Sequence, residues 1–271
     1  QQGGAESTPP VHIWLRNKFE SMELLIKKNF DVFLISESKL DSSFPDAQFF
    51  IPEYRIFRKD RNANGGGLFF YVNEDIPCKK IENFQFNSSG EFIALELNLG
   101  KQKILVLGVY KPPSVKNDVF LNDLHNATTY YSTFYDNFIL LGDFNIQREN
   151  EDLANFCDSF LFKHLIKENT CYKGKNPSNI DHLITNISNR FMKSQAIETG
   201  ISDHHKMIMT IFRSTFAKHK FKFYHYRDYK NFEIEIVQKE MAEKIGGFKK
   251  NSVDKFLNLL VAIFRSLTSC T

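Results

Sequence analysis

The sequence lacks the features that mark membrane-spanning, secreted and zinc-finger proteins. No stretch approaches the roughly 20 apolar residues that cross a bilayer. The opening residues, QQGGAESTPP, have neither a basic segment nor an apolar run, so they do not form a secretory signal. Four cysteines occur without a CxxC pair or a metal-finger spacing: Cys78, Cys157, Cys171 and Cys270. We therefore expect reduced thiols in an intracellular protein, nuclear or cytoplasmic and not membrane-bound, although the sequence leaves a disulfide open.

Tryptophan occurs only once, and neither sign of charge dominates. Lysine and arginine number 35 against 32 for aspartate and glutamate, which gives a formal net charge of +3. This balance permits a polyanionic partner but does not require one. Phenylalanine, in contrast, occurs 28 times, and 42% of the 271 residues are hydrophobic. That is enough for an aromatic-rich core in one large domain, or in a domain with an appendage.

Hydrophobic periodicity predicts both helices and strands. Apolar residues at helical spacing predict a helix from Leu15 to about Lys28. Alternation over 91–99 is typical of a half-buried strand, and 103–110 pairs with it as a hairpin. Further elements are expected as strands at 31–37, 65–72, 138–141, 178–186 and 205–212, and as a helix at 119–134. Seven or eight strands with a few helices favour a core of sheets covered by helices.

The composition changes near Arg213. The segment that follows is basic and aromatic, and two helices are expected after it. Its lysines and rings suit a track for a nucleic-acid backbone, but an ordinary edge strand explains the same alternation. We therefore expect a disordered lead-in at 1–10, an α/β domain at 11–214, and a connector with two helices at 215–271.

Polar side chains stand where the predicted strands end. Glu37 follows the first strand, Tyr110 ends the hairpin, and Asp143 with Asn145 follows 138–141. Comparable positions later in the chain hold Asp181, Asp203 and His204. Each residue alone is explained by a turn or a cap. Carboxylates are costly to bury unless they are paired or bind a metal, so five such strand ends favour one polar cluster at a sheet edge.

A cluster of this kind suits the hydrolysis of a phosphodiester. Glu37 is a suitable ligand for Mg²⁺, which takes one or two carboxylates together with phosphate and water. Asp143 is suited to accept a proton from water, and Asn145 to donate to a phosphate oxygen. A histidine held by an aspartate, as in the stretch with His204, stabilises charge on the phosphate. The sequence does not distinguish Mn²⁺ from Mg²⁺ as the ion at this site.

Six motifs carry a resemblance to a known family, in the order SESKL, GGGLFFYV, GVYKPP, LLGDFN, SNIDHLITN and GISDHH. They resemble the endonuclease domain of non-LTR (LINE-like) retrotransposons. That domain belongs to the exonuclease-endonuclease-phosphatase superfamily, alongside apurinic/apyrimidinic repair endonucleases. The resemblance covers roughly residues 15–212 and implies a four-layer α/β sandwich, two mixed β-sheets face to face with helices outside. The segment after 214 resembles the connector that leads to a reverse transcriptase.

The resemblance also implies a role for each polar strand end. Glu37 resembles the metal-binding glutamate, and Tyr110 resembles the tyrosine that contacts phosphate. Asp143 and Asn145 match the pair that activates water and contacts phosphate. Asp181 resembles the aspartate that orients the histidine. Asp203 resembles a further carboxylate of the metal site, and His204 resembles the histidine that contacts phosphate.

One position departs from the family pattern. Members usually have an asparagine on a first strand just before RNKF, and this chain has Val11 there. The resemblance implies a Mg²⁺-dependent endonuclease that nicks one DNA strand and leaves a 3′ hydroxyl. The alternative is a catalytically weak or dead remnant that keeps the fold and binds nucleic acid. A phosphatase or phospholipid diesterase of the same superfamily ranks third, and target preference and oligomeric state stay open.

Overall fold

The computed structural model of the chain describes residues 13–62, 65–172, 176–198 and 206–214. All of them belong to the first of two units into which the chain divides, residues 1–220. Several expectations from the sequence lie outside the described residues: the lead-in at 1–10, Val11, the pair Asp203 and His204, and the connector at 215–271.

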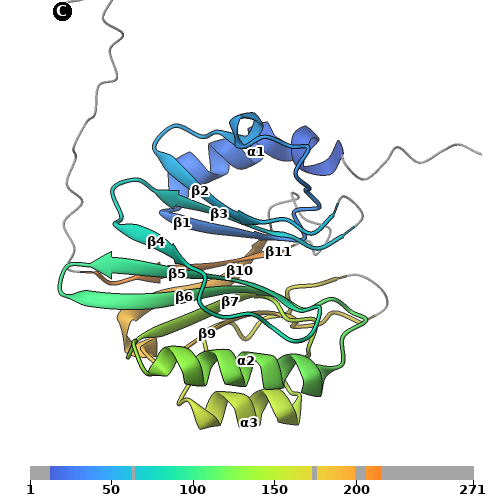
Figure 1. The fold of residues 1–271 in the computed structure, drawn as a ribbon, viewed down its shortest axis with the longest axis vertical. Helices are drawn as coiled ribbons and strands as arrows, with labels where there is room; N and C mark the ends of the chain where they lie inside the picture. The colour runs from blue at the N-terminus through green and yellow to red at the C-terminus, as the bar shows by residue number, and fades with distance from the viewer. Residues whose placement is uncertain (1–12, 63–64, 173–175, 199–205, 215–271) are drawn as a thin grey trace, which may run out of the picture. The chain divides into compact units, whose positions relative to one another are not determined.

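The described part of the first unit has four layers (Figure 1). Helix α1 (Ile13–Asn29) covers an antiparallel sheet of order β1-β3-β2. A six-stranded sheet of order β4-β5-β6-β7-β9-β8 lies beneath it, and its outer face is covered by α2 (Asn117–Ser132) and α3 (Glu151–Ser159). The α/β sandwich expected from the sequence is confirmed.

The strands are short, and most neighbours are antiparallel. In the six-stranded sheet only β6 and β7 run parallel, which makes that sheet mixed. A separate antiparallel pair is formed by β10 and β11. The bounds are β1 Val32–Ser36, β2 Tyr54–Lys59, β3 Leu68–Asn73, β4 Cys78–Ile81, β5 Glu91–Leu99, β6 Gln102–Tyr110, β7 Phe138–Asp143, β8 Lys163–His164, β9 Asp181–Thr185, β10 Phe191–Glu198 and β11 Lys206–Phe212, with 3-10 turns at Asp46–Phe49 and Ser188–Arg190.

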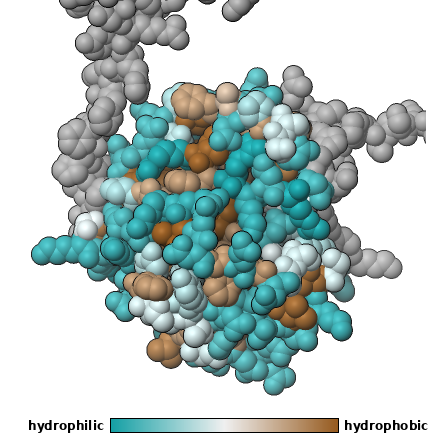
Figure 2. Space-filling model, viewed as in Figure 1, coloured by the Kyte–Doolittle hydropathy of each residue, from teal (hydrophilic) through white to brown (hydrophobic). Residues whose placement is uncertain are grey.

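Three apolar clusters hold the layers together. One lies between α1 and the three-stranded sheet and contains Met22, Phe69 and Tyr71. The second fills the space between the sheets, and the third packs the six-stranded sheet against α2 and α3. On the face seen in Figure 2, apolar side chains occur in small groups among hydrophilic ones. The burial of aromatic rings in these clusters explains the high phenylalanine content.

Strand β5 differs from the half-buried strand that its alternation predicts. Ile93 and Leu95 pack between the two sheets, whereas Phe92 and Ala94 pack toward α2. Both faces of the strand are therefore covered, and the expectation of a solvent-facing side is wrong. Glu96, on the α2 side, is also buried, because a tyrosine and two lysines surround its carboxylate.

Several elements were not expected from the sequence. These are β2, β4, α3, β8 and β10. Charged residues interrupt the apolar pattern of β2, and β8 is only two residues long. Helix α3 does carry a start signal, since the side chain of Asn150 accepts a hydrogen bond from the Leu153 N–H at 3.0 Å. Cys78, Cys157 and Cys171 are free, as expected. Among the described helices, none is long and apolar enough to cross a membrane.

Candidate active site

Four polar residues form a row across four neighbouring strands of the six-stranded sheet. Glu91 on β5 lies opposite Tyr110 on β6, and Tyr110 lies opposite Asp143 on β7. Asp143 in turn lies opposite Asp181 at the start of β9. Residues opposite one another in a sheet point to the same face, here the face that packs on the three-stranded sheet. The structure thus brings together three of the residues predicted from the sequence.

Glu37 reaches this row from the other sheet. It follows β1 with a φ of 55°, and the next two residues are fixed to the glycine turn before β3. The Ser38 N–H donates to the Gly67 carbonyl at 3.1 Å, and the Lys39 N–H donates to the Gly66 carbonyl at 2.9 Å. A non-glycine residue in the left-handed region is strained, and such strain is found mainly at functional sites.

Tyr110 joins the two sheets at the site. Its hydroxyl donates a hydrogen bond to Oε1 of Glu37, and the other carboxylate oxygen of Glu37 lies 3.5 Å from the ammonium of Lys39. The ring is 2% exposed. Burial, the bond to Glu37 and the nearby charge of Asp143 raise the pKa of Tyr110 well above its ordinary value. Tyr110 therefore remains a protonated donor at physiological pH.

Glu91 belongs to the site and was not predicted. Its Oε2 accepts from the Gly67 N–H at 2.7 Å, and its Oε1 lies 3.3 Å from Arg61. Burial raises the pKa of this carboxyl, and the Gly67 N–H and Arg61 oppose the shift. The available signal was an acidic residue at the first position of an otherwise apolar strand.

The Gly142–Asn145 turn is built around Asp143. The Asn145 N–H donates to Oδ1 at 2.9 Å, and the Asn145 amide lies 3.2 Å from Oδ2. The same amide donates to the Lys111 carbonyl at 2.8 Å, and Asn145 has a φ of 46°. Gly142 must be glycine, because a Cβ there would lie 1.9 Å from the Val109 carbonyl oxygen. The turn therefore fixes the position of the Asp143 carboxylate.

A buried lysine stands beside this turn. Lys111 is 2% exposed, and its backbone N–H donates to the Asp143 carbonyl at 2.9 Å. Burial lowers the pKa of Lys111, and the charge of Asp143 opposes that shift. The Lys111 amine donates to the Pro112 carbonyl at 3.4 Å, and sequence reasoning did not identify this residue.

His182 and Asn179, on either side of Asp181 in the sequence, have different surroundings. His182 points to the opposite face, where its ring is fully buried against Phe144 and its Nε2 lies 2.8 Å from the Ile146 carbonyl. It is a core residue. Asn179 is 3% exposed, and neither polar atom of its side chain has a hydrogen-bond partner. An unsatisfied buried amide two residues before Asp181 is a further group available to a ligand.

Metal binding has only partial support in the described residues. In ranges 13–62, 65–172, 176–198 and 206–214, no three histidine, cysteine, aspartate or glutamate side chains are grouped to hold a metal ion. Mg²⁺ does not need such a cage, because it commonly keeps waters and substrate phosphate with one or two carboxylates. Glu37 fits that requirement as one ligand, and Asp203 lies outside the described residues.

Comparison with solved structures places the fold in a known group. One similar structure is the endonuclease domain of TRAS1, a telomere-specific non-LTR retrotransposon, with a TM-score of 0.56 and 12% identity over 77% of this chain and 94% of that one. An AP endonuclease from Archaeoglobus fulgidus has a TM-score of 0.56 and 16% identity over 73% of this chain and 95% of that one. The 3′ phosphatase NExo from Neisseria, bound to product DNA hairpin, has a TM-score of 0.58 and 14% identity over 73% of this chain and 95% of that one. No family model and no curated protein matches the sequence. The chain thus has the endonuclease/exonuclease/phosphatase fold that its motifs imply.

Proposed function

We propose that this chain is a metal-dependent DNA endonuclease that nicks one strand by phosphodiester hydrolysis. The observation that carries the proposal is the row of Glu91, Tyr110, Asp143 and Asp181, with Glu37 hydrogen-bonded to Tyr110 across the two sheets. Carboxylates, a phenol and an amide that meet at one sheet edge are the groups that this reaction requires. The similar structures include a retrotransposon endonuclease domain, an AP endonuclease and a 3′ phosphatase bound to a DNA hairpin.

In the proposed reaction, Asp143 accepts a proton from water as the water oxygen bonds to phosphorus. The bond from phosphorus to O3′ breaks, and O3′ takes a proton from solvent water, while Asp143 later releases the proton it accepted to solvent. The products are a 3′ hydroxyl and a 5′ phosphate. In this proposal the Tyr110 hydroxyl turns from Glu37, and the Asn145 amide turns one N–H from Asp143, so that both donate to phosphate oxygens as negative charge grows there. His204, oriented by Asp181 and Asp203, has the same task in this proposal.

Glu37, together with Asp203, would hold Mg²⁺ or Mn²⁺. A bound divalent ion polarises the phosphate and lowers the pKa of water. In this proposal Tyr110 and Asn145 would contact the substrate whether or not the ion is bound; it is supported by Tyr110 being kept protonated and by Asn145 being held by Asp143 and the Lys111 carbonyl.

The test is conversion of supercoiled plasmid to open circle in Mg²⁺, with EDTA as the chemical control. Asp143→Asn keeps the size of the side chain and removes the base, so we expect it to abolish nicking while circular dichroism stays unchanged. His204→Ala should do the same. If Asp143→Asn cuts as fast as the parent chain, the assignment of the base is wrong.

A second candidate is a domain that binds DNA but does not cut it. It is favoured by the state of Glu37, whose two oxygens are taken by Tyr110 and Lys39. Salt-sensitive binding of duplex DNA without nicking in Mg²⁺ or Mn²⁺ would select this candidate. Turnover of phosphoinositides or sphingomyelin would instead select a phospholipid diesterase.

A further inference from the structure

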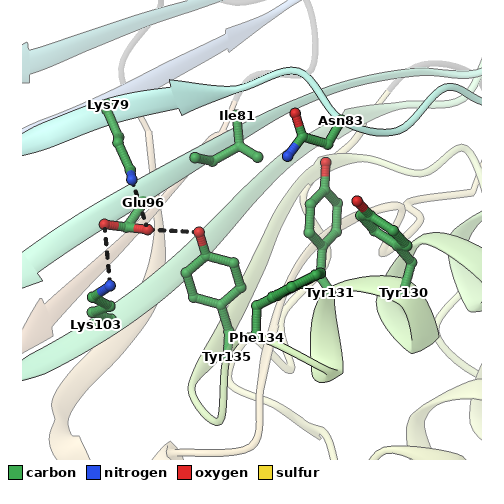
Figure 3. A pocket seen from close by; sticks show the side chains of 9 residues that line it. All are labelled: Lys79, Ile81, Asn83, Glu96, Lys103, Tyr130, Tyr131, Phe134 and Tyr135. Atoms are coloured by element: carbon green, nitrogen blue, oxygen red, sulfur yellow. Dashed lines mark hydrogen bonds and ion pairs between the residues drawn. The ribbon is translucent and has the colours of Figure 1, made fainter.

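A pocket lies away from the row formed by Glu91, Tyr110, Asp143 and Asp181. It has a volume of about 280 Å³ and opens between β4, β5 and the end of α2 (Figure 3). Its floor carries Glu96, five positions along β5 from Glu91. Five positions span roughly 16 Å and reverse the face of the strand, so the pocket and the row lie on opposite faces of the six-stranded sheet.

The floor of this pocket is a built polar arrangement. Glu96 is 4% exposed, and its Oε2 accepts a hydrogen bond from the Tyr135 hydroxyl at 2.6 Å. Lys79 and Lys103 approach the same carboxylate at 3.4 and 4.0 Å. Burial favours the neutral acid, but the bonds from Tyr135, Asn98 and Lys79 outweigh it and lower the pKa of Glu96. The carboxylate is therefore charged and already compensated.

The two lysines are only partly used by Glu96. Their side chains are 60% and 62% exposed, so their ammonium groups keep donors directed to solvent. Two cations against one carboxylate leave a local excess of positive charge at the mouth. A cationic ligand is disfavoured by this excess, and an anionic group such as a phosphate is favoured.

The remaining wall is aromatic and has an unused polar atom. Phe134 is 65% exposed at the mouth, and Tyr130 and Tyr131 stand beside it on α2. The Tyr131 residue is 1% exposed, yet its hydroxyl has no hydrogen-bond partner, and Figure 3 shows it directed toward Asn83. A buried hydroxyl without a partner is rare and is satisfied when a ligand supplies one. The exposed Phe134 ring offers a face for stacking.

We propose that this pocket binds one nucleotide, with its base against Phe134 and the Tyr131 hydroxyl and its phosphate between Lys79 and Lys103. The volume suits a single nucleotide and is below that of typical drug-sized sites. The nucleotide comes either from solution or from a single nucleic-acid strand. Base stacking on aromatic rings beside basic residues is the general means of binding single strands. The proposal does not depend on cutting, because it concerns the opposite face of the sheet.

The test measures binding by the full chain in EDTA, so that no cutting occurs. Calorimetry measures the binding of dAMP, and fluorescence anisotropy measures the binding of a short fluorescein-labelled deoxyadenylate strand. Phe134→Ala should weaken binding of the preferred probe about 10-fold. Tyr131→Phe removes only the hydroxyl and should weaken binding roughly 5-fold. Lys103→Gln should lower the salt slope for the strand by about 0.7.

Matched controls lie on other parts of the surface. Met192→Ala removes a side chain that is 62% exposed on β10, and Lys163→Gln removes an exposed lysine on β8; both should bind as the parent chain does. Binding of dAMP assigns the pocket to free nucleotides, and binding of the strand alone assigns it to nucleic acid. The proposal is overturned if neither probe binds at millimolar concentration, or if the three pocket variants match the controls. Nicking activity, measured separately, bears only on the row at the other face.

Discussion

The hydroxyl of Tyr110 donates to Glu37 although the two residues are 73 positions apart in the chain. One belongs to the six-stranded sheet and the other follows the edge strand of the three-stranded sheet. This bond connects the two sheets at the place where the polar side chains gather. A variant that lacks it, compared with a control variant elsewhere in the sheet, distinguishes a catalytic effect from a structural one.

Tyr110→Phe is expected to lower nicking by about 100-fold, the usual loss when one donor to a developing charge is removed. Tyr135→Phe is a matched control, because that hydroxyl also donates to a glutamate carboxylate, Glu96, but lies away from the row. Both variants should lose a similar, small amount of stability in urea, roughly 1 kcal/mol. Equal nicking by the two variants would contradict the role given to Tyr110.

Gly67→Ala tests the turn that holds Glu37 in place. Gly67 has a φ of 89°, and a Cβ there would lie 2.4 Å from the Ser38 hydroxyl oxygen. We expect a loss of roughly 1–3 kcal/mol in unfolding free energy and a parallel loss of nicking. Gly65→Ala is the control, since nothing lies within 4 Å of its added Cβ and its φ is not in the left-handed region. Urea unfolding of both variants, with identical slopes, measures the difference.

Stability is expected to fall in mild acid because of a buried histidine pair. His164 and His182 lie with ring centroids 5.0 Å apart, and burial, with the neighbouring imidazole, lowers the pKa of His164 to about 4. When folding lowers the pKa of a histidine, the contribution of that histidine to stability is fully present at a pH above its unfolded pKa of about 6.5. The contribution is lost as the pH falls from about 6.5 to about 4. The loss should reach roughly 3 kcal/mol for His164, because one pKa unit corresponds to about 1.4 kcal/mol.

His164→Gln should flatten this pH dependence in urea titrations between pH 7 and 4, whereas His125→Gln, at an exposed position, should leave it unchanged. An unaltered profile in the His164 variant would show that other groups cause the acid sensitivity.

The thiols of half-buried Cys78 and buried Cys157 should resist alkylation in the native state. Burial raises the pKa of Cys78 to about 11 and that of Cys157 to about 12. The thiolate is the reactive species, so iodoacetamide at pH 8 should label both at least 100-fold more slowly in the native protein than in urea. Mass spectrometry of the two peptides gives the rates. Rapid native labelling of Cys157 would place that side chain in an opening that the structure does not have.

Much of the fold could be predicted because apolar runs in this chain are long and continuous. Strands β3, β6 and β7 and helix α1 follow from periodicity within a few residues. Strand β2 did not, since Arg55 and Arg58 interrupt its apolar pattern and are held in part by distant partners: Arg55 by the Cys78 carbonyl and Arg58 by Asp46. The covering of both faces of β5 is a tertiary effect that local alternation does not report.

The site could be predicted in part. Asp143, Asp181 and Tyr110 mark strand ends, and the sheet places such ends together. Glu91 and Asn179 could not be identified as site residues from the sequence. Glu91 begins an apolar strand, and Asn179 stands out only because its side chain is buried. The predicted participation of Asp203 and His204 stays a prediction.

The row from Glu91 to Asp181 has a consequence for insertions and deletions. Side chains alternate along a strand, so a one-residue insertion within β6 or β7, upstream of Tyr110 or Asp143, would turn the residue that follows it to the helix-covered face. The site would then be lost although none of its residues had changed. Loops such as the Gly100–Lys101 turn can absorb added length, whereas the interiors of these strands cannot. Tolerance of length changes along the chain is therefore a direct measure of which strand pairings create the site.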